Sequence, residues 1–290
     1  MEHVTVVGAG TMGNGIAHVF GQHERSVTLV DVSAEALDAA RATIERNLAR
    51  QVDRGRLTRP EADAALARIA TSTVLAEAVA GADLVVEVAT ENEAVKQRLF
   101  AEIDAAAPPA CILASNTSSI SITRLAGATD RPAQVIGMHF MNPVPVMRLV
   151  EVIRGYATSD STAQAIVALA EAIGKTPVEV SDYPGFVSNR ILMPMINEAI
   201  YALWQGVAGV EAIDTVMRLG MAHPMGPLHL ADFIGLDVCL SILRVLQEGL
   251  GEAKYAPCPL LVNMVAAGKL GVKMGEGFYV HEGKERRVAR

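Results

Sequence analysis

The chain has 290 residues, 51% of them hydrophobic and 20% charged, which is enough material for a buried core in one large domain or two. No apolar run approaches the roughly 18 residues that a membrane span needs, and no basic leader precedes the first strand-like run, so neither a span nor a signal peptide is expected. A net charge of −7 argues against nucleic-acid binding. The cysteines are odd in number and lack paired spacing, which is typical of buried thiols in a cytoplasmic protein rather than of a disulfide framework or a metal site. They are Cys111, Cys239 and Cys258.

The first 180 or so residues alternate short β-branched runs with alanine-rich helical stretches. This alternation is typical of an α/β domain with a mostly parallel sheet covered by helices. The predicted strands are Val4–Val7, Ser26–Asp31, Asp83–Val88, Cys111–Ser115, Val135–Phe140, Leu149–Ile153 and Thr176–Val180.

A long helical stretch follows the second of these strands and is broken at "DRGRLTRPE". Gly55 and Pro60 mark a turn in that segment, which predicts two helices forming a hairpin that projects from the sheet. From Pro184 onward the pattern becomes wholly helical. We therefore expect two domains, residues 1–183 and an all-α C-terminal domain of residues 184–290.

Within the second domain, the stretch Ile191–Trp204 is apolar almost all round. Such a helix is expected to pack against other helices or against another subunit. The polar end of the chain, "EGKERRVAR", is predicted to be a solvated tail.

A glycine-rich segment, "VTVVGAGTMGNGIA", places Gly8, Gly10 and Gly13 after a strand and at the opening of a helix. The first glycine permits a tight turn, the second lets the backbone approach a pyrophosphate, and the third allows close packing of helix and strand. The next strand ends in Asp31, 18 residues after Gly13, where a carboxylate can bind ribose hydroxyls. The segment predicts a Rossmann-type, doubly wound dinucleotide-binding domain. NAD is favoured over NADP because Asp31 would repel a 2′-phosphate; the alternative is that Asp31 or Ser33 merely caps a helix.

Polar side chains follow the next strands, at the edge where ligands of parallel sheets bind. "ILASNTSS" places Asn116, Thr117, Ser118 and Ser119 after one strand, and "HFMNPVPVMRLVE" begins near the end of the next.

His139 and Glu151 are equidistant from Pro145, so in an antiparallel hairpin they would face each other. A glutamate beside a histidine fixes the imidazole tautomer and stabilises its protonated form, as a general base for an alcohol requires. The alternative is a core histidine beside an edge-strand charge, but a nicotinamide site nearby favours the base.

Six segments resemble, in order, the motifs of the (S)-3-hydroxyacyl-CoA dehydrogenase family, and the short bacterial 3-hydroxybutyryl-CoA dehydrogenases most of all. They span residues 4 to 280 and read "GAGTMG", "SNTSSISIT", "HFMNPVPVMRLVEVI", "DYPGFVSNRILMP", "HPMGPLHLADFIGLD" and "GVKMGEGFY". The resemblance implies a reversible NAD-dependent oxidation of a 3-hydroxyacyl-CoA.

The resemblance also implies a catalytic set of Ser118, His139, Glu151 and Asn189. His139 would take the proton of the C3 hydroxyl and Glu151 would orient it, while Ser118 and Asn189 would bond the substrate oxygens. The active site would lie in the interdomain cleft, and hydride transfer would depend on domain closure. Spacing alone would instead indicate that Ser118 caps a helix and that Asn189 belongs to a polar helix face.

The cofactor contacts implied by the resemblance lie in the glycine loop and at scattered polar positions. They are Gly8, Gly10, Thr11, Met12, Gly13, Asp31, Glu91, Lys96, Asn116, Asn142 and Lys273.

Arg46, Arg50 and Arg54 recur every four residues and so share one face of the projecting hairpin. In the family this hairpin contacts coenzyme A, and a basic stripe suits its phosphates. The implied coenzyme A contacts are Asn47, Arg50 and Arg54, together with Ser118. The alternative is a solvated face in which acidic residues alternate with the arginines.

The resemblance further implies a homodimer through the C-terminal domain. Two residues depart from the family pattern near the nicotinamide site, Met141 and Met274.

Two other functions remain open: a dehydrogenase of a non-CoA 3-hydroxy compound such as a sugar acid or carnitine, and a catalytically silent relative. The sequence does not determine the acyl-chain length of the substrate or the physiological direction of the reaction. It also does not determine the pathway, which could be fatty-acid β-oxidation, butanoate or polyester metabolism, or aromatic degradation.

Overall fold

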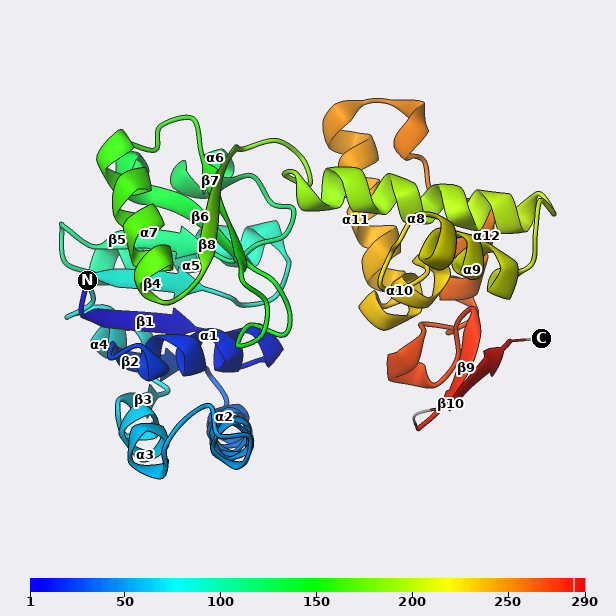
Figure 1. The fold of residues 1–290 in the computed structure, drawn as a ribbon. Helices are drawn as coiled ribbons and strands as arrows, with labels where there is room; N and C mark the ends of the chain where they lie inside the picture. Colours follow the sequence, from blue (N-terminus) through cyan, green and yellow to red (C-terminus); the bar gives the residue numbers. More distant parts are fainter. Residues whose placement is uncertain (284, 290) are drawn as a thin grey trace. The chain divides into compact units, whose positions relative to one another are not determined.

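The computed structural model describes residues 1–283 and 285–289. The chain divides into two compact units, Met1–Tyr183 and Pro184–Arg290, and each is described by itself (Figure 1). Within the described residues, no helix is long and apolar enough to cross a membrane.

The first unit is built on an eight-stranded sheet in the order β3-β2-β1-β4-β5-β6-β7-β8. All neighbouring strands are parallel except β6 and β7, which are antiparallel. The chain changes its direction of travel across the sheet at β1, and ligands of doubly wound folds bind beyond the strand ends at such a switch point. The strands are β1 (His3–Val7), β2 (Ser26–Val30), β3 (Ile69–Ser72), β4 (Leu84–Glu87), β5 (Ile112–Ser115), β6 (Val135–Phe140), β7 (Leu149–Arg154) and β8 (Thr176–Ser181).

The predicted mostly parallel α/β fold is confirmed, and each of the seven predicted strands ends within one residue of its predicted bounds. The edge strand β3 was not predicted. Only its first residue, Ile69, is buried, so the segment lacks the apolar alternation that marks a strand.

Helices cover both faces of this sheet. They are α1 (Thr11–Gln22), α2 (Ala34–Asp53), α3 (Arg59–Ala67), α4 (Leu75–Val79), α5 (Glu93–Ala106), α6 (Ile122–Ala126) and α7 (Asp160–Ala172), with a 3₁₀ turn, η1 (Pro132–Gln134). Val86, Ala114, Met138 and Val150 belong to the apolar core that also contains residues of α1 and α7. Because successive strand residues point to opposite faces, the neighbours of these four residues point to the other face. Those neighbours are Glu87, Ser115, His139 and Glu151.

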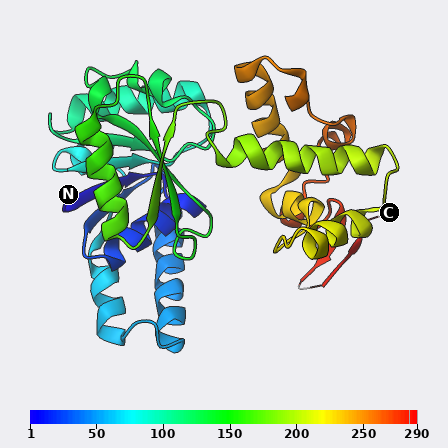
Figure 2. The same ribbon diagram turned by 45° about the horizontal axis from the view of Figure 1, so that its top comes forward.

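The predicted helical hairpin is also confirmed (Figure 2). Gly55 adopts a φ of +65° at the turn after α2. Thr58 then opens α3 with a capping box, in which its side chain accepts from the Glu61 amide and Glu61 bonds back to the Thr58 amide. Capping at this point, with Pro60 in the first turn, separates the long stretch into two helices.

The second unit is mainly helical, as predicted. Its helices are α8 (Ser188–Trp204), α9 (Val210–Gly220), α10 (Pro227–Ile234), α11 (Leu236–Leu250) and α12 (Pro259–Ala266), with 3₁₀ turns η2 (Ala253–Tyr255) and η3 (Val272–Met274). One side of α8 is buried in the core of this unit with Met193 and Ile196, whereas Ile191 and Trp204 are 67% and 53% exposed.

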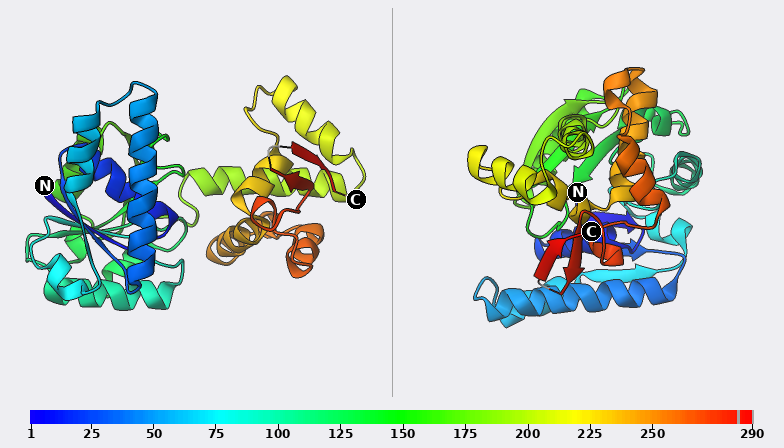
Figure 3. Two further views of the ribbon diagram at one scale, coloured as in Figure 1. Left: turned by 90° about the horizontal axis from the view of Figure 1, so that it is seen from below. Right: turned by 90° about the vertical axis from the view of Figure 1, so that its right-hand side faces the viewer.

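The end of the chain is exposed, as predicted, but this helical unit also contains two strands that were not predicted. Strands β9 (Tyr279–Glu282) and β10 (Glu285–Val288) form an antiparallel pair (Figure 3). All four β10 residues are exposed and three of them are charged, which is why the sequence of this segment indicated a solvated tail. The Arg286 guanidinium lies 5.2 Å from the centre of the Tyr279 ring, a cation–π contact that holds the outer strand.

Candidate active site

The glycine loop forms a tight turn between β1 and α1. Gly8 has a φ of +115°, and its amide donates to the Val30 carbonyl at 2.7 Å. A Cβ on Gly13 would lie 1.8 Å from the Gly8 carbonyl oxygen, so only glycine lets helix and loop pack this closely. A Cβ on Gly10 would meet nothing within 4 Å, and no side chain caps the first turn of α1. The loop therefore leaves open space at a helix N-terminus, which fits the pyrophosphate of a dinucleotide.

Asp31 follows β2 and is bonded to this loop. Its carboxylate accepts from the Ala9 amide at 2.8 Å and from the Ser33 amide at 3.0 Å. The helix-cap alternative applies to Ser33, whose hydroxyl accepts from the Ala36 amide at the start of α2. Asp31 thus fixes the glycine loop against the end of β2, at the position where a ribose would lie.

His139 and Glu151 face each other across the β6–β7 ladder, as their spacing predicted. The His139 Nδ1 atom lies 2.8 Å from Glu151 Oε2, and the two residues are 6% and 2% exposed. A carboxylate this close favours the tautomer with the proton on Nδ1, which places the lone pair of the neutral ring on Nε2. Nε2 lies 3.1 Å from the Ser118 hydroxyl. The loop after β5 and the two strands thus bring a hydroxyl, an imidazole and a carboxylate together in a series of contacts.

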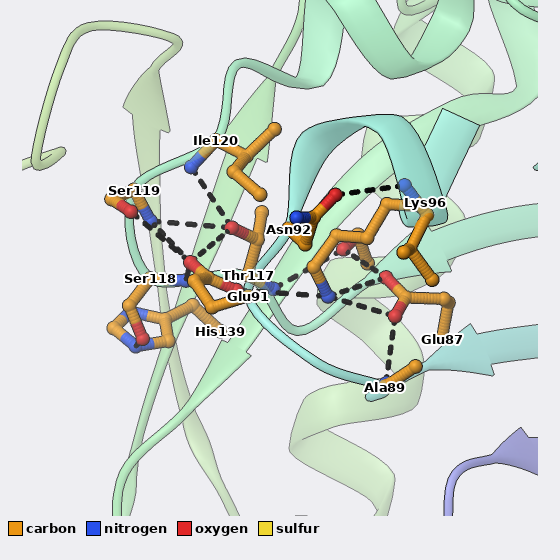
Figure 4. A network of polar contacts seen from close by, with 12 residues as sticks. Glu87, Ala89, Glu91, Asn92, Lys96, Thr117, Ser118, Ser119, Ile120 and His139 are labelled. Atoms are coloured by element: carbon orange, nitrogen blue, oxygen red, sulfur yellow. Dashed lines mark hydrogen bonds and ion pairs between the residues drawn. The ribbon is translucent and has the colours of Figure 1, made fainter. Parts of the chain in front are cut away.

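The loop that carries Ser118 is held by Glu91 (Figure 4). Glu91 Oε1 accepts from the Thr117 hydroxyl at 2.6 Å, from the Ser118 amide at 2.9 Å and from both the amide and the hydroxyl of Ser119 at 3.1 Å. One carboxylate oxygen therefore gathers three successive residues of the loop.

Lys96 lies behind Glu91 and is 1% exposed. Its Nζ atom lies 2.7 and 2.9 Å from the two carboxylate oxygens of Glu87 and 3.6 Å from Glu91 Oε2. Glu87 is fully buried and also accepts from the Ala89 amide and the Ser115 hydroxyl, each at 2.7 Å. Glu87 was missed from the sequence. Its one local signal is that it ends the apolar run "LVVE" nine residues before a lysine.

The other implied cofactor residues lie in both units. The Asn116 side-chain oxygen accepts from the Phe140 amide at 2.8 Å, which ties the end of β5 to β6, and Asn142 lies two residues beyond the end of β6. In the second unit, Lys273 Nζ lies 2.6 Å from Asp237 Oδ2, and Asn189 lies 8% exposed in the first turn of α8.

The implied coenzyme A residues lie on α2 and at its end. Arg46 and Arg50 are exposed on the helix, and Arg54 is the exposed residue that follows it. Arg50 Nη1 lies 3.5 Å from the Asn47 side-chain oxygen, so these two side chains are within hydrogen-bond distance of each other on the helix.

A serine, a histidine and a carboxylate in line also occur in enzymes that use a serine nucleophile. Here the set lies on the same sheet as a glycine loop that fits a dinucleotide. The fold and the site together define the class of nucleotide-dependent dehydrogenases.

Comparisons with known proteins define the family. Residues 3–183 match the NAD binding domain of 3-hydroxyacyl-CoA dehydrogenase, and residues 185–281 match its C-terminal domain. The chain is 56% identical over 284 residues to the probable 3-hydroxybutyryl-CoA dehydrogenase of Bacillus subtilis, which covers 98% of this chain and 99% of that protein. The chain therefore belongs to the 3-hydroxyacyl-CoA dehydrogenase family and is an NAD-dependent oxidoreductase.

Solved structures agree with this assignment. The crystal structure of (S)-3-hydroxybutyryl-CoA dehydrogenase from Ralstonia eutropha matches with a TM-score of 0.94 at 49% identity, covering 97% of this chain and 99% of that one. A diketoreductase that acts on dicarbonyl compounds matches with a TM-score of 0.83 at 32% identity, covering 97% and 99%.

Proposed function

We propose that the chain interconverts (S)-3-hydroxybutyryl-CoA and acetoacetyl-CoA, with His139 as the group that takes and returns the substrate proton. The observation that carries this proposal is the line of Ser118 Oγ, the His139 imidazole and the Glu151 carboxylate, with contacts of 3.1 and 2.8 Å. The two relatives named for 3-hydroxybutyryl-CoA support the choice of a short acyl chain.

In the oxidation direction, His139 Nε2 accepts the proton of the C3 hydroxyl. Glu151, buried beside Nδ1, stabilises the positive charge that the ring then carries. NAD held at the glycine loop would supply the acceptor for the hydride of C3. We assign Ser118 and Asn189 to the substrate oxygens, which fixes C3 for the transfer, and in the reduction direction His139 returns the proton.

The glycine loop, with Asp31, supplies the residues that would hold the cofactor. Gly8 and Gly13 shape the turn, Gly10 leaves room for the pyrophosphate, and Asp31 would bond the adenosine ribose. Thr11 and Met12 open α1 next to the phosphates, and Glu91, Lys96, Asn116, Asn142 and Lys273 remain the further proposed contacts.

We also propose that the exposed arginines Arg50 and Arg54, with Asn47, bind the phosphates of coenzyme A. Arginine presents several donors in a fixed plane and suits phosphate oxygens. Binding energy from this distant part of the substrate would be used to raise the rate at C3.

The test is NADH oxidation with acetoacetyl-CoA and, in parallel, with free acetoacetate. The thioester is expected to be turned over with a kcat/KM roughly 10²-fold higher or more, because the free acid lacks the coenzyme A contacts. A series of 3-oxoacyl-CoA substrates of increasing length then checks the short-chain preference, which predicts a fall in kcat/KM as the chain grows. Equal turnover of thioester and free acid would contradict the coenzyme A role.

A non-CoA substrate is the second candidate, because the similar diketoreductase acts on dicarbonyl compounds. NADH binding without turnover of any thioester, together with reduction of a free diketone, would favour this candidate.

We further propose a homodimer formed through the second unit. Its support is the large apolar side chains that this unit exposes, among them Ile191, Trp204, Leu219 and Met221. Light scattering at micromolar concentration should give twice the mass of the chain, and a monomer at that concentration would contradict the proposal.

A cytoplasmic location is proposed from the cysteines. Cys111, Cys239 and Cys258 are buried free thiols, and burial raises the pKa of Cys111 to about 11 and that of Cys239 to about 12. Thiols kept unreactive in this way suit a reducing compartment.

A further inference from the structure

The Glu87–Lys96 pair is an unusual feature of the first unit because both charges lie in the protein interior. Lys96 is 1% exposed and Glu87 is 0% exposed. Removing two charges from water is costly, and an apolar pair of similar size often serves stability as well or better. The pair therefore calls for an explanation other than stability.

The pair is joined to the proposed active site by an unbroken series of polar contacts (Figure 4). Glu87 lies at the end of β4 and holds Lys96, which lies in the first turn of α5. Lys96 lies 3.6 Å from Glu91 Oε2, and the other oxygen of Glu91 holds the loop of Thr117, Ser118 and Ser119.

Each contact in this series fixes a different part of the next group. Glu87 uses both of its oxygens on Lys96 Nζ, so the ammonium group has a fixed position. The ammonium group in turn attracts Glu91 Oε2, which sets how far Oε1 reaches toward the loop. The Ser118 amide bonded to Oε1 then fixes the position of the Ser118 hydroxyl, 3.1 Å from His139 Nε2.

We propose that Glu87 is a positioning residue for the reaction: acting through Lys96 and Glu91, it sets the Ser118 hydroxyl against His139 Nε2. This inference rests on the proposed function, because it gives Ser118 and His139 their catalytic roles. It goes beyond that function in assigning a task to a carboxylate that is fully buried.

The charge of Glu87 is the property that matters in this proposal. A glutamine at this position would retain an oxygen for the Ala89 amide but would no longer balance the charge of Lys96. The ammonium group would then be drawn toward Glu91 Oε2, and Oε1 would move with its carboxylate. Because a displacement of about 1 Å can cost about 10²-fold in rate, a small shift of the Ser118 loop should be visible in kcat.

The test compares Glu87→Gln with a matched control, Asp104→Asn. Asp104 lies near the C-terminal end of α5, the helix that carries Lys96, and forms a largely buried ion pair with Arg131. At saturating NADH, Glu87→Gln should lower kcat for acetoacetyl-CoA about 10-fold to 10²-fold. Asp104→Asn should lower the Tm and leave kcat within about 2-fold of the wild type.

A second variant covers the case in which Glu87→Gln does not fold. Glu87→Gln combined with Lys96→Met removes both buried charges, so neither is left without its partner. At saturating NADH its kcat should remain at least about 10-fold below the wild type, since Glu91 has lost the cation that holds it. Wild-type kcat in this double variant, or an equal loss of kcat in Asp104→Asn, would overturn the proposal.

A measurement without turnover separates this inference from the proposed function. The ¹⁵N NMR signal of His139 Nε2, assigned by substitution of His139, should shift in the double variant because the Ser118 hydroxyl has moved away. If the wild type turned over no 3-oxoacyl-CoA, the proposed function would fail while this shift still supported the positioning role. An unchanged signal with wild-type turnover intact would overturn the positioning role alone.

Discussion

Two buried histidines of the first unit have surroundings that differ in one respect. His18, in α1, is 1% exposed, and its Nε2 lies 3.1 Å from the Gln22 amide oxygen and 3.0 Å from the Gln51 amide nitrogen. His139, on β6, is 6% exposed and has the Glu151 carboxylate at 2.8 Å. One imidazole bonds neutral amides, with His23 and Lys175 as the other titratable groups that act on it, and the other imidazole is paired with an anion.

The difference decides what each ring can do. Burial without a counter-charge lowers the pKa of His18 to about 4, so this ring is neutral at physiological pH and serves to join α1 to α2. Glu151 gives His139 a partner for a positive charge, which a group that accepts a proton from an alcohol needs. Burial alone therefore does not suit a histidine to carry a proton, whereas the carboxylate beside His139 provides what the proposed role of this residue requires.

The largest effect is expected for His139→Ala. Loss of the group that moves the proton should lower kcat roughly 10²–10⁴-fold, the usual contribution of a positioned acid or base. NADH affinity, measured by fluorescence titration, should change little because the glycine loop is intact. An unchanged kcat would remove His139 from the mechanism.

A smaller loss of rate is expected for Ser118→Ala, which removes the hydroxyl next to Nε2. One hydrogen bond to a charged group is worth about 1.5–3 kcal/mol, so kcat/KM for acetoacetyl-CoA should fall about 10-fold to 10²-fold. Ser121→Ala is the matched control, since Ser121 bonds Asp182 and the start of α6 instead. Equal losses in the two variants would mean that the loop, and not the Ser118 hydroxyl, was affected.

Substitution of His18 should change the stability of the protein rather than the rate of the reaction. Its pKa is lowered from 6.5 to about 4, so below pH 6.5 the unfolded chain binds a proton that the folded chain does not. The free energy of unfolding should therefore fall by ~3 kcal/mol as the pH falls from 6.5 to 4. In His18→Gln this part of the pH dependence should disappear, whereas a control substitution of the exposed His3 should retain it; denaturant unfolding at a series of pH values measures the difference. If the free energy of unfolding depended on pH in the same way in His18→Gln and in the wild type, the lowered pKa of His18 would be contradicted.

Much of the site depends on local spacing and was for that reason predictable. The glycine loop, Asp31 and the facing of His139 and Glu151 follow from positions counted along one or two neighbouring elements. Alternation along a strand also decides which residues share a face, and this needs no tertiary information.

The parts that were missed depend on contacts between distant segments. Glu87 meets Ser115 because β4 and β5 are neighbours in the sheet, and the strand order cannot be read from either segment. Lys96 looks like an ordinary charge at the start of a helix until the fold places Glu87 beneath it. The β9–β10 pair was missed because its outer strand is charged and exposed, with Arg286 held on the Tyr279 ring.

The central claim is that Glu151 makes His139 able to carry the substrate's proton, and the pH profile of Glu151→Gln tests it most directly. The rate of acetoacetyl-CoA reduction should be measured against pH in wild type and variant at saturating NADH. Without the carboxylate the protonated ring is less favoured, so the pH at which the rate declines should move to lower values and the maximum should fall on the order of 10-fold or more. Superimposable profiles in a folded variant would show that Glu151 is only structural and would contradict the account.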